Sequence, residues 1–68
     1  MTEIYSVLGK KVKERRNKLK LTQERLAEIS GLHRTYIAGI EKGKRNVSIK
    51  NLEKIARALK VKPDELLK

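Results

Sequence analysis

The stretch LTQERLAEISGLHRTYIAGIE, residues 21–41, predicts two short helices separated by a sharp break. Thr22 suits the N-cap of the first helix, because its hydroxyl can accept a hydrogen bond from a first-turn N–H. The apolar residues expected to face inward from this helix are Leu26, Ala27 and Ile29. Gly31 suits the left-handed backbone conformation in which helices often end. A second helix is expected at about His33 to Glu41, with Gly43 in the following loop as its terminator, so the spacing predicts a helix-turn-helix over about 22–41.

The second helix of this pair has an apolar side and a polar side. Ile37 and Ile40 are expected to face the core. The residues left facing outward are His33, Arg34, Thr35, Ala38 and Gly39. The N-terminal half of such a helix reaches base edges when it lies in the major groove of DNA. An ordinary helical hairpin in a small bundle is the alternative interpretation, but the exposed Arg-Thr pair and the charge of the chain favour DNA binding.

Helical patterns also fill the rest of the chain. From about Glu3 to Lys20, apolar residues recur at helical spacing and are interrupted by Arg15; they are Ile4, Leu8, Val12 and Leu19. Ser48 is a second good N-cap, and the apolar residues that follow it are Leu52, Ile55, Ala56 and Leu59. Pro63 suits the first turn of a last short helix that ends at Leu67. We therefore expect an all-α fold of five helices in one domain, residues 1–68.

Composition narrows the class of partner. The 68 residues include 18 Lys and Arg against 8 Asp and Glu, which gives a net charge of +10 and a pI of about 10.2. Such a charge points to a polyanion as the partner. The chain has no cysteine and one histidine, which excludes a disulfide scaffold, a thiolate zinc site and a multi-histidine metal cage. No catalytic set of side chains is evident, so we expect no enzyme activity, metal, cofactor or small-molecule ligand.

The sequence gives no sign of a membrane or secretion role. No apolar run approaches the roughly 20 residues that a membrane span needs. The N-terminus lacks a basic region followed by an apolar stretch, so we expect no secretion signal and a cytoplasmic protein.

Several strings resemble one known family. Residues 21–27 (LTQERLA), Gly31-Leu32, Ile40-Glu41, Gly43 and the pattern from Ser48 to Leu59 are similar to lambda-repressor-like, Cro/C1-type (XRE family) helix-turn-helix domains. The resemblance spans about Leu8 to Leu67 and implies a compact five-helix DNA-binding domain. Within that family, GLHRTYI at 31–37 and RNVS at 45–48 resemble the controller proteins of restriction–modification systems. Those are small dimeric regulators of about this length.

This resemblance implies a homodimeric transcriptional regulator that binds a palindromic operator in double-stranded DNA. Phage-type repressors and antitoxins share most of the scaffold and remain alternatives. An antitoxin acting through a protein partner would be expected to carry an added neutralising segment, and this sequence stops after the fifth expected helix. A nonspecific nucleic-acid or RNA binder would be expected to expose aromatic stacking platforms, whereas the chain has two tyrosines and no Phe or Trp.

The candidate DNA contacts fall into two groups. Arg34 and Thr35 are predicted to read bases, because arginine can donate twice to guanine and threonine can contact a base edge; for Arg34 a phosphate contact is the alternative. The residues predicted to contact the DNA backbone are Gln23, His33, Tyr36, Lys42, Lys44, Arg45 and Asn46. Tyr36 could instead pack on the core, and Asn46 could hold its loop. Because Ala38 and Gly39 carry no polar side chain, direct readout is expected to be sparse and DNA bending important.

Two further sets complete the expectations. The resemblance implies a partly buried ion pair between Arg16 and Glu41 that joins the first helix to the end of the third. The C-terminal part carries more apolar residues than two short helices need to close one core, and the predicted dimer interface is Ile49, Val61, Leu66 and Leu67. The alternative is that these residues roof the monomer core.

Overall fold

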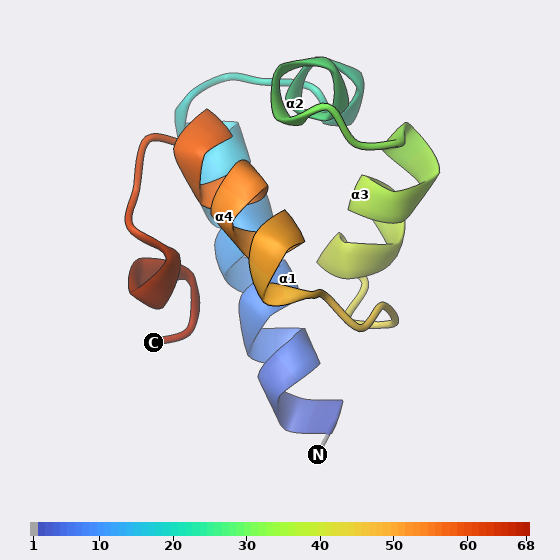
Figure 1. Ribbon diagram of the computed structural model, residues 1–68, viewed down its shortest axis with the longest axis vertical. Coiled ribbons are helices and arrows are strands. Elements are labelled where there is room, and N and C mark those ends of the chain that lie inside the picture. The colour runs from blue at the N-terminus through green and yellow to red at the C-terminus, as the bar shows by residue number, and fades with distance from the viewer. Residues whose placement is uncertain (1) are drawn as a thin grey trace.

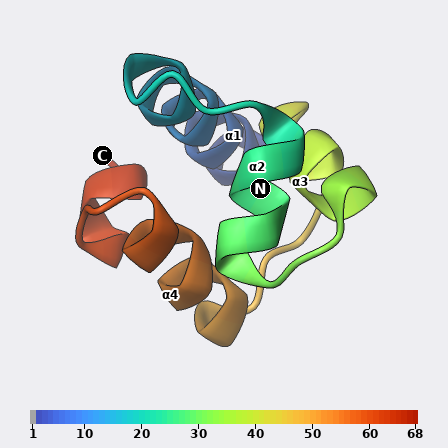
Figure 2. The ribbon, with the colours of Figure 1, turned by 90° about the horizontal axis from the view of Figure 1, so that it is seen from above.

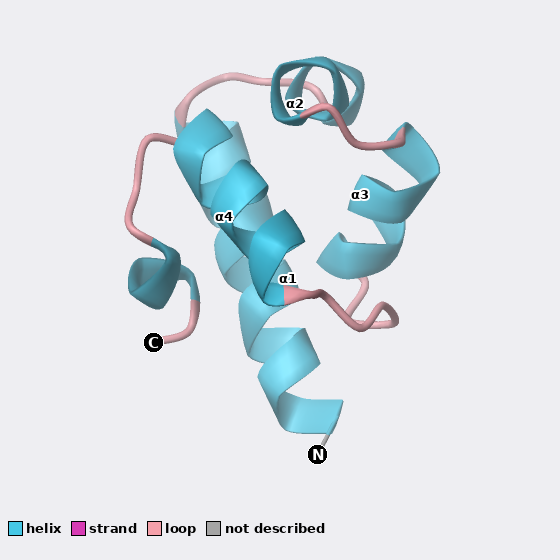
Figure 3. Cartoon of the chain, viewed as in Figure 1, coloured by secondary structure: helices cyan, strands magenta, loops and turns pink. Residues whose placement is uncertain are grey.

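The computed structural model describes residues 2–68, which form four α-helices and one 3-10 turn (Figures 1 and 3). The elements are α1 (Thr2–Lys18), α2 (Gln23–Ser30), α3 (Arg34–Glu41), α4 (Ile49–Ala58) and η1 (Pro63–Leu66). Among these residues there is no strand, so the all-α prediction is confirmed. The prediction of five α-helices is wrong. The last segment makes only hydrogen bonds three residues apart, from Glu65 N to Lys62 O and from Leu67 N to Asp64 O, and therefore ends as a single turn.

α1 is the longest helix and packs against α3 and η1. α3 packs against α1 and α2, while α4 packs against α2 and η1 (Figure 2). η1 returns to α1 on the opposite side of the molecule from α3, as both ribbon views show. The molecule measures 29 × 22 × 21 Å along its principal axes.

One core joins all five elements. The side chains that are fully buried are Val12, Leu26, Ile37, Ile40, Ile55, Leu59 and Leu66. The inward expectation for Ile29 is wrong, because this residue is 46% exposed, and Ile4, at the start of the apolar stripe of α1, is exposed to the same extent. In α2 the buried stripe is instead Leu26, Ala27 and Ser30, and Ser30 satisfies its hydroxyl by donating to the Ala27 carbonyl at 3.3 Å. A short polar side chain thus takes the place expected for Ile29.

The helix ends follow local chemistry. Thr22 Oγ1 accepts from Arg25 N at 3.0 Å and Ser48 Oγ accepts from Asn51 N at 3.1 Å, which confirms both predicted N-caps. Each α-helix is followed by a residue with positive φ and by paired hydrogen bonds back to the last turn. These residues are Lys20, Gly31, Gly43 and Lys60. The predictions for the two glycines are confirmed, and two lysines hold the same conformation at a steric cost.

Gly9 allows α1 and α3 to approach closely. A Cβ atom built there would collide with the Ile40 carbonyl oxygen and lie 3.0 Å from the Glu41 carbonyl oxygen. No side chain other than hydrogen fits this crossing. The approach brings the end of α3 beside the C-terminal half of α1, where Arg16 lies.

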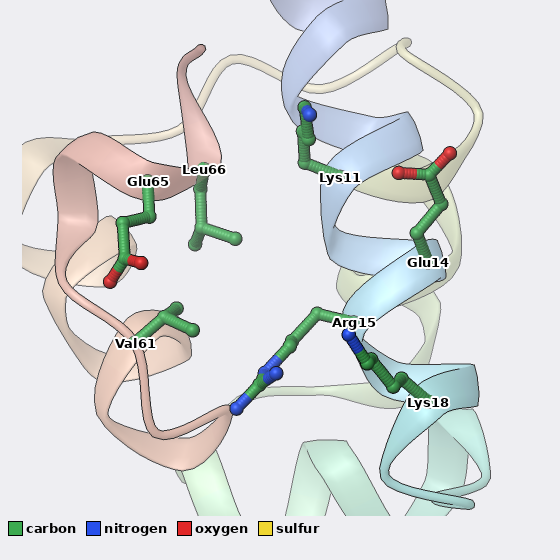
Figure 4. A pocket seen from close by; sticks show the side chains of 7 residues that line it. All are labelled: Lys11, Glu14, Arg15, Lys18, Val61, Glu65 and Leu66. Atoms are coloured by element: carbon green, nitrogen blue, oxygen red, sulfur yellow. The ribbon is translucent and has the colours of Figure 1, made fainter.

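The side of α1 that faces η1 forms a cleft of about 290 Å³. Figure 4 shows Lys11, Arg15 and Lys18 on its α1 wall, with Val61 and Leu66 opposite. Arg15 Nε donates to the Leu59 carbonyl at 3.0 Å and so closes the C-terminal end of α4. Arg15 therefore joins two helices instead of merely interrupting the apolar stripe of α1. None of the helices in residues 2–68 is long and apolar enough to cross a membrane.

Candidate nucleic-acid interface

The helix-turn-helix is formed by α2, the turn at Gly31-Leu32 and α3. Gly31 has a φ of 74°, and the Leu32 N–H donates back to the Ala27 carbonyl at 3.0 Å. Leu32 is half-buried against the core. The turn is therefore held both by its backbone hydrogen bond and by packing, and it fixes the direction in which α3 leaves α2.

A buried ion pair anchors the other end of α3. Arg16 donates to the two carboxylate oxygens of Glu41 at 2.6 and 3.0 Å, and its Nη1 donates to the Leu21 carbonyl at 2.7 Å. The side chains of Arg16 and Glu41 are only 11% and 3% exposed. Donation of these hydrogen bonds to the Glu41 carboxylate raises the pKa of the Arg16 guanidinium above its ordinary value. The ion pair expected from the resemblance is thus present.

Gln23 is the third member of this cluster. Its Nε2 donates to Glu41 Oε1 at 3.1 Å, so the first residue of α2 is tied to the last residue of α3. Gln23 also lines a cleft of about 420 Å³ with Thr22, Glu24 and Arg34. α1, α2 and α3 are therefore joined by side chains as well as by packing. The DNA contact predicted for Gln23 stays a prediction.

The first turn of α3 presents its side chains to solvent. His33, Arg34 and Thr35 are all exposed, and His33 occupies the N-cap position without making a side-chain capping bond. Because the core side of α3 is held by Ile37 and Ile40, this turn can project from the surface without loss of packing. The two predicted base-reading residues therefore lie together on an exposed helix start.

Tyr36 and the basic loop form one connected group. The Tyr36 hydroxyl accepts from Asn51 Nδ2 at 3.1 Å and donates to the Asn46 carbonyl at 3.5 Å. Arg45 lies over the Tyr36 ring, 5.9 Å from its centroid. The Arg45 side chain also crosses Gly39, where an added Cβ would lie 2.6 Å from Arg45 Cγ. Gly39, one of the residues expected to face outward, is therefore partly covered by the Arg45 side chain.

The other loop residues remain free for contact with a partner. Lys42, Lys44 and Asn46 are exposed, and Asn46 holds the loop through its backbone carbonyl and not through its side chain. Gly43 has a φ of 72° and lies close to Ser6 of α1. A Cβ atom added to Gly43 would lie 3.1 Å from the Cα and Oγ atoms of Ser6. The loop is thus placed beside α3 and against α1.

Comparison with known proteins identifies the family. A family model described as helix-turn-helix matches residues 12–66. The chain belongs to this helix-turn-helix family. It is 52% identical to control protein C.BamHI of Bacillus amyloliquefaciens over 65 residues, which cover 94% of this chain and 80% of that relative.

Two solved structures extend the comparison. The restriction–modification controller protein C.AhdI from Aeromonas hydrophila has a TM-score of 0.89 and 45% identity, covering 91% of this chain and 94% of that one. C.Esp1396I, solved bound to a 19 base pair DNA duplex, has a TM-score of 0.84 and 41% identity over 93% of this chain and 84% of that one. The expected resemblance to restriction–modification controller proteins is confirmed.

The residues predicted for a dimer interface of this helix-turn-helix chain divide into two kinds. Ile49 is 86% exposed and Leu67 is 40% exposed, while Val61 is half-buried against the core. Leu66 is only 2% exposed, and in Figure 4 its side chain points toward α1. The expectation for Leu66 is corrected accordingly: the short 3-10 turn directs this side chain into the monomer core, which leaves no surface for a partner.

Sequence reasoning missed Asn51, which donates to the Tyr36 hydroxyl from a different helix. It also missed the contact between Gly39 and the Arg45 side chain, which folds back from the loop after α3. Asn51 carried one local signal, because it stands three residues after the Ser48 cap. In the described part of the chain, no three His, Asp or Glu side chains are grouped to hold a metal ion.

Proposed function

We propose that this chain is a sequence-specific DNA-binding transcriptional regulator, a homodimeric controller protein of a restriction–modification system. The observation that carries the proposal is the identity of 41–52% to control proteins over nearly the whole chain, one of which is solved on DNA. The net charge of +10 supports a polyanionic partner. The chain acts by binding and not by catalysis, and it acts in the cytoplasm.

In this proposal α3 lies in the major groove. Arg34 and Thr35 read base edges from the exposed first turn, where arginine donates to guanine O6 and N7. The residues that contact the DNA backbone are Gln23, His33, Tyr36, Lys42, Lys44, Arg45 and Asn46. The Arg16–Glu41 pair contributes by holding the helix and not by touching DNA.

The dimer follows from the size of the site. One reading head touches few base pairs, whereas two heads related by twofold symmetry double the site and its specificity. Ile49, Val61 and Leu67 form the proposed interface, because Ile49 and Leu67 expose apolar surface on the C-terminal side of the molecule. Burial of that apolar surface in the dimer contributes about 25 cal/mol per Å² to the free energy of association.

Two measurements test the proposed function. A gel shift compares the duplex upstream of the chain's own gene with random DNA at one salt concentration, and the upstream duplex is expected to bind at least 1000-fold more tightly. Equal affinity for both would refute sequence-specific regulation. Sedimentation equilibrium at micromolar concentration is expected to show a dimer that Leu67→Asp converts to a monomer, with Lys68→Asp as the matched control. A wild-type monomer across the range would refute the dimer.

A further inference from the structure

Asn51 occupies a special place at the start of α4. It is the third residue after the Ser48 cap, and its backbone N–H is held by the Ser48 hydroxyl at 3.1 Å. A glutamate or glutamine in this place usually returns its side chain to the cap and completes a capping box. Asn51 instead extends to α3 and donates from Nδ2 to the Tyr36 hydroxyl at 3.1 Å. Because the cap fixes its backbone, the amide is presented to Tyr36 from a rigid point.

This contact determines how the Tyr36 hydroxyl can be used. A phenol has one proton to donate and an oxygen that accepts. The Asn51 amide occupies the oxygen, so the proton is directed elsewhere, to the Asn46 carbonyl at 3.5 Å. That distance lies beyond the usual range for O–H···O bonds, which makes this a weak bond. The Tyr36 hydroxyl proton therefore has a defined direction but only a weak acceptor, and it lies at the edge of the exposed surface of α3.

We propose that Asn51 is a positioning residue that makes Tyr36 a hydrogen-bond donor toward DNA, with the Asn46 carbonyl as its partner in the free protein. The inference rests on the proposed function. DNA offers matching acceptors in its phosphate oxygens and in purine N7, guanine O6 and thymine O4. It also presents amino donors on adenine and cytosine, which a hydroxyl fixed as donor cannot satisfy. Asn51 thereby restricts which groups Tyr36 can contact, although it lies on a different helix.

The contact is tested first in the free protein. The chain has two tyrosines, so Tyr5 serves as an internal reference for Tyr36. With 13C-labelled tyrosine, the Cζ resonance of Tyr36 is expected to shift in Asn51→Ala while that of Tyr5 stays in place. Asn17→Ala, which removes an exposed asparagine on α1, is the matched control and leaves both resonances unchanged. An unchanged Tyr36 resonance in folded Asn51→Ala protein, as judged by circular dichroism, overturns the inference.

The effect on DNA is tested by a double-mutant cycle on a duplex that the wild-type protein selects from a random library. Asn51→Ala is expected to weaken binding about three- to tenfold, the usual effect of one lost neutral hydrogen bond. In a Tyr36→Phe background the same change is expected to alter affinity by less than about twofold, because the hydroxyl it positions is gone. If Asn51→Ala weakens binding by the same factor in the wild-type and the Tyr36→Phe backgrounds, Asn51 contacts DNA itself. That result overturns the positioning role but not the proposed function. A wild-type chain that selects no sequence overturns the proposed function as well.

Discussion

Removal of the Glu41 carboxylate is the sharpest test of what holds α3 in place. In Glu41→Ala, Arg16 keeps its bond to the Leu21 carbonyl but loses both acceptors of the Nε and Nη2 groups. The Arg16 side chain is 11% exposed, so a largely buried charge is left without a counter-ion. Such a change costs about 3–5 kcal/mol. A chain of 68 residues has a total stability of about 3–10 kcal/mol, so the variant is expected to lose from about a third to all of it.

The measurement is urea unfolding followed by circular dichroism, with thermal melting as a second probe. A loss of about 3 kcal/mol corresponds to a fall in melting temperature of more than about 12 °C in a domain of this size. Glu28→Ala is the matched control, because the Arg25–Glu28 pair is about 60% exposed on both sides. Its removal is expected to cost less than about 1 kcal/mol.

A double variant separates pairing from packing. Arg16→Met with Glu41→Leu removes both charges and keeps apolar bulk, so it is expected to recover most of the stability that Glu41→Ala loses. If Glu41→Ala unfolds at the same urea concentration as Glu28→Ala, the buried-pair argument is refuted.

Further predictions concern reading, helix ends and helix crossing. Arg34→Ala is expected to cost about 1–3 kcal/mol of binding free energy on the cognate duplex and to relax base preference; equal losses on cognate and random DNA would make Arg34 a phosphate ligand. Lys44→Ala is expected to weaken binding to all duplexes alike and to reduce the slope of log affinity against log salt concentration by about one. Lys60→Gly is expected to stabilise the fold by about 0.5–1 kcal/mol, because Lys60 has a φ of 60° and glycine relieves that strain; a lower melting temperature would contradict this. Gly9→Ala should destabilise by about 1–2 kcal/mol despite alanine's better helix propensity, because its Cβ meets the Ile40 carbonyl, and a melting temperature at or above wild type would show that the crossing relaxes.

Local features were the part of the fold that could be predicted. The caps at Thr22 and Ser48 and the helix ends at Gly31 and Gly43 depend on a few adjacent residues, and all four were predicted from the sequence. The helix-turn-helix followed from their spacing.

Features that depend on packing between distant segments could not be predicted in the same way. In α2, Ser30 is buried where Ile29 was expected. Both residues stand at helical spacing from Leu26, so the sequence pattern favoured the more apolar one, and only the packing of α2 against α3 and α4 distinguishes them. Leu66 was assigned to a dimer surface because its apolar character fits either place, and only the path of η1 back to α1 distinguishes them. The spacing of Asn51 from the Ser48 cap did not reveal that its side chain reaches Tyr36 on α3, and the absence of a side chain at Gly39 did not reveal that Arg45 folds back over it.

The side-chain links among α1, α2 and α3 have a consequence for how an operator can vary. Gln23, Arg16 and Glu41 tie the three helices into one unit, so α3 cannot tilt to follow a displaced base pair. In the proposed dimer, the separation of the two α3 helices sets the separation of the two half-sites on the DNA. Inserting one base pair turns the second half-site by about 35° and moves it by about 3.4 Å. In the proposed dimer, the length of the central spacer is therefore expected to be selected as strictly as the bases on either side of it.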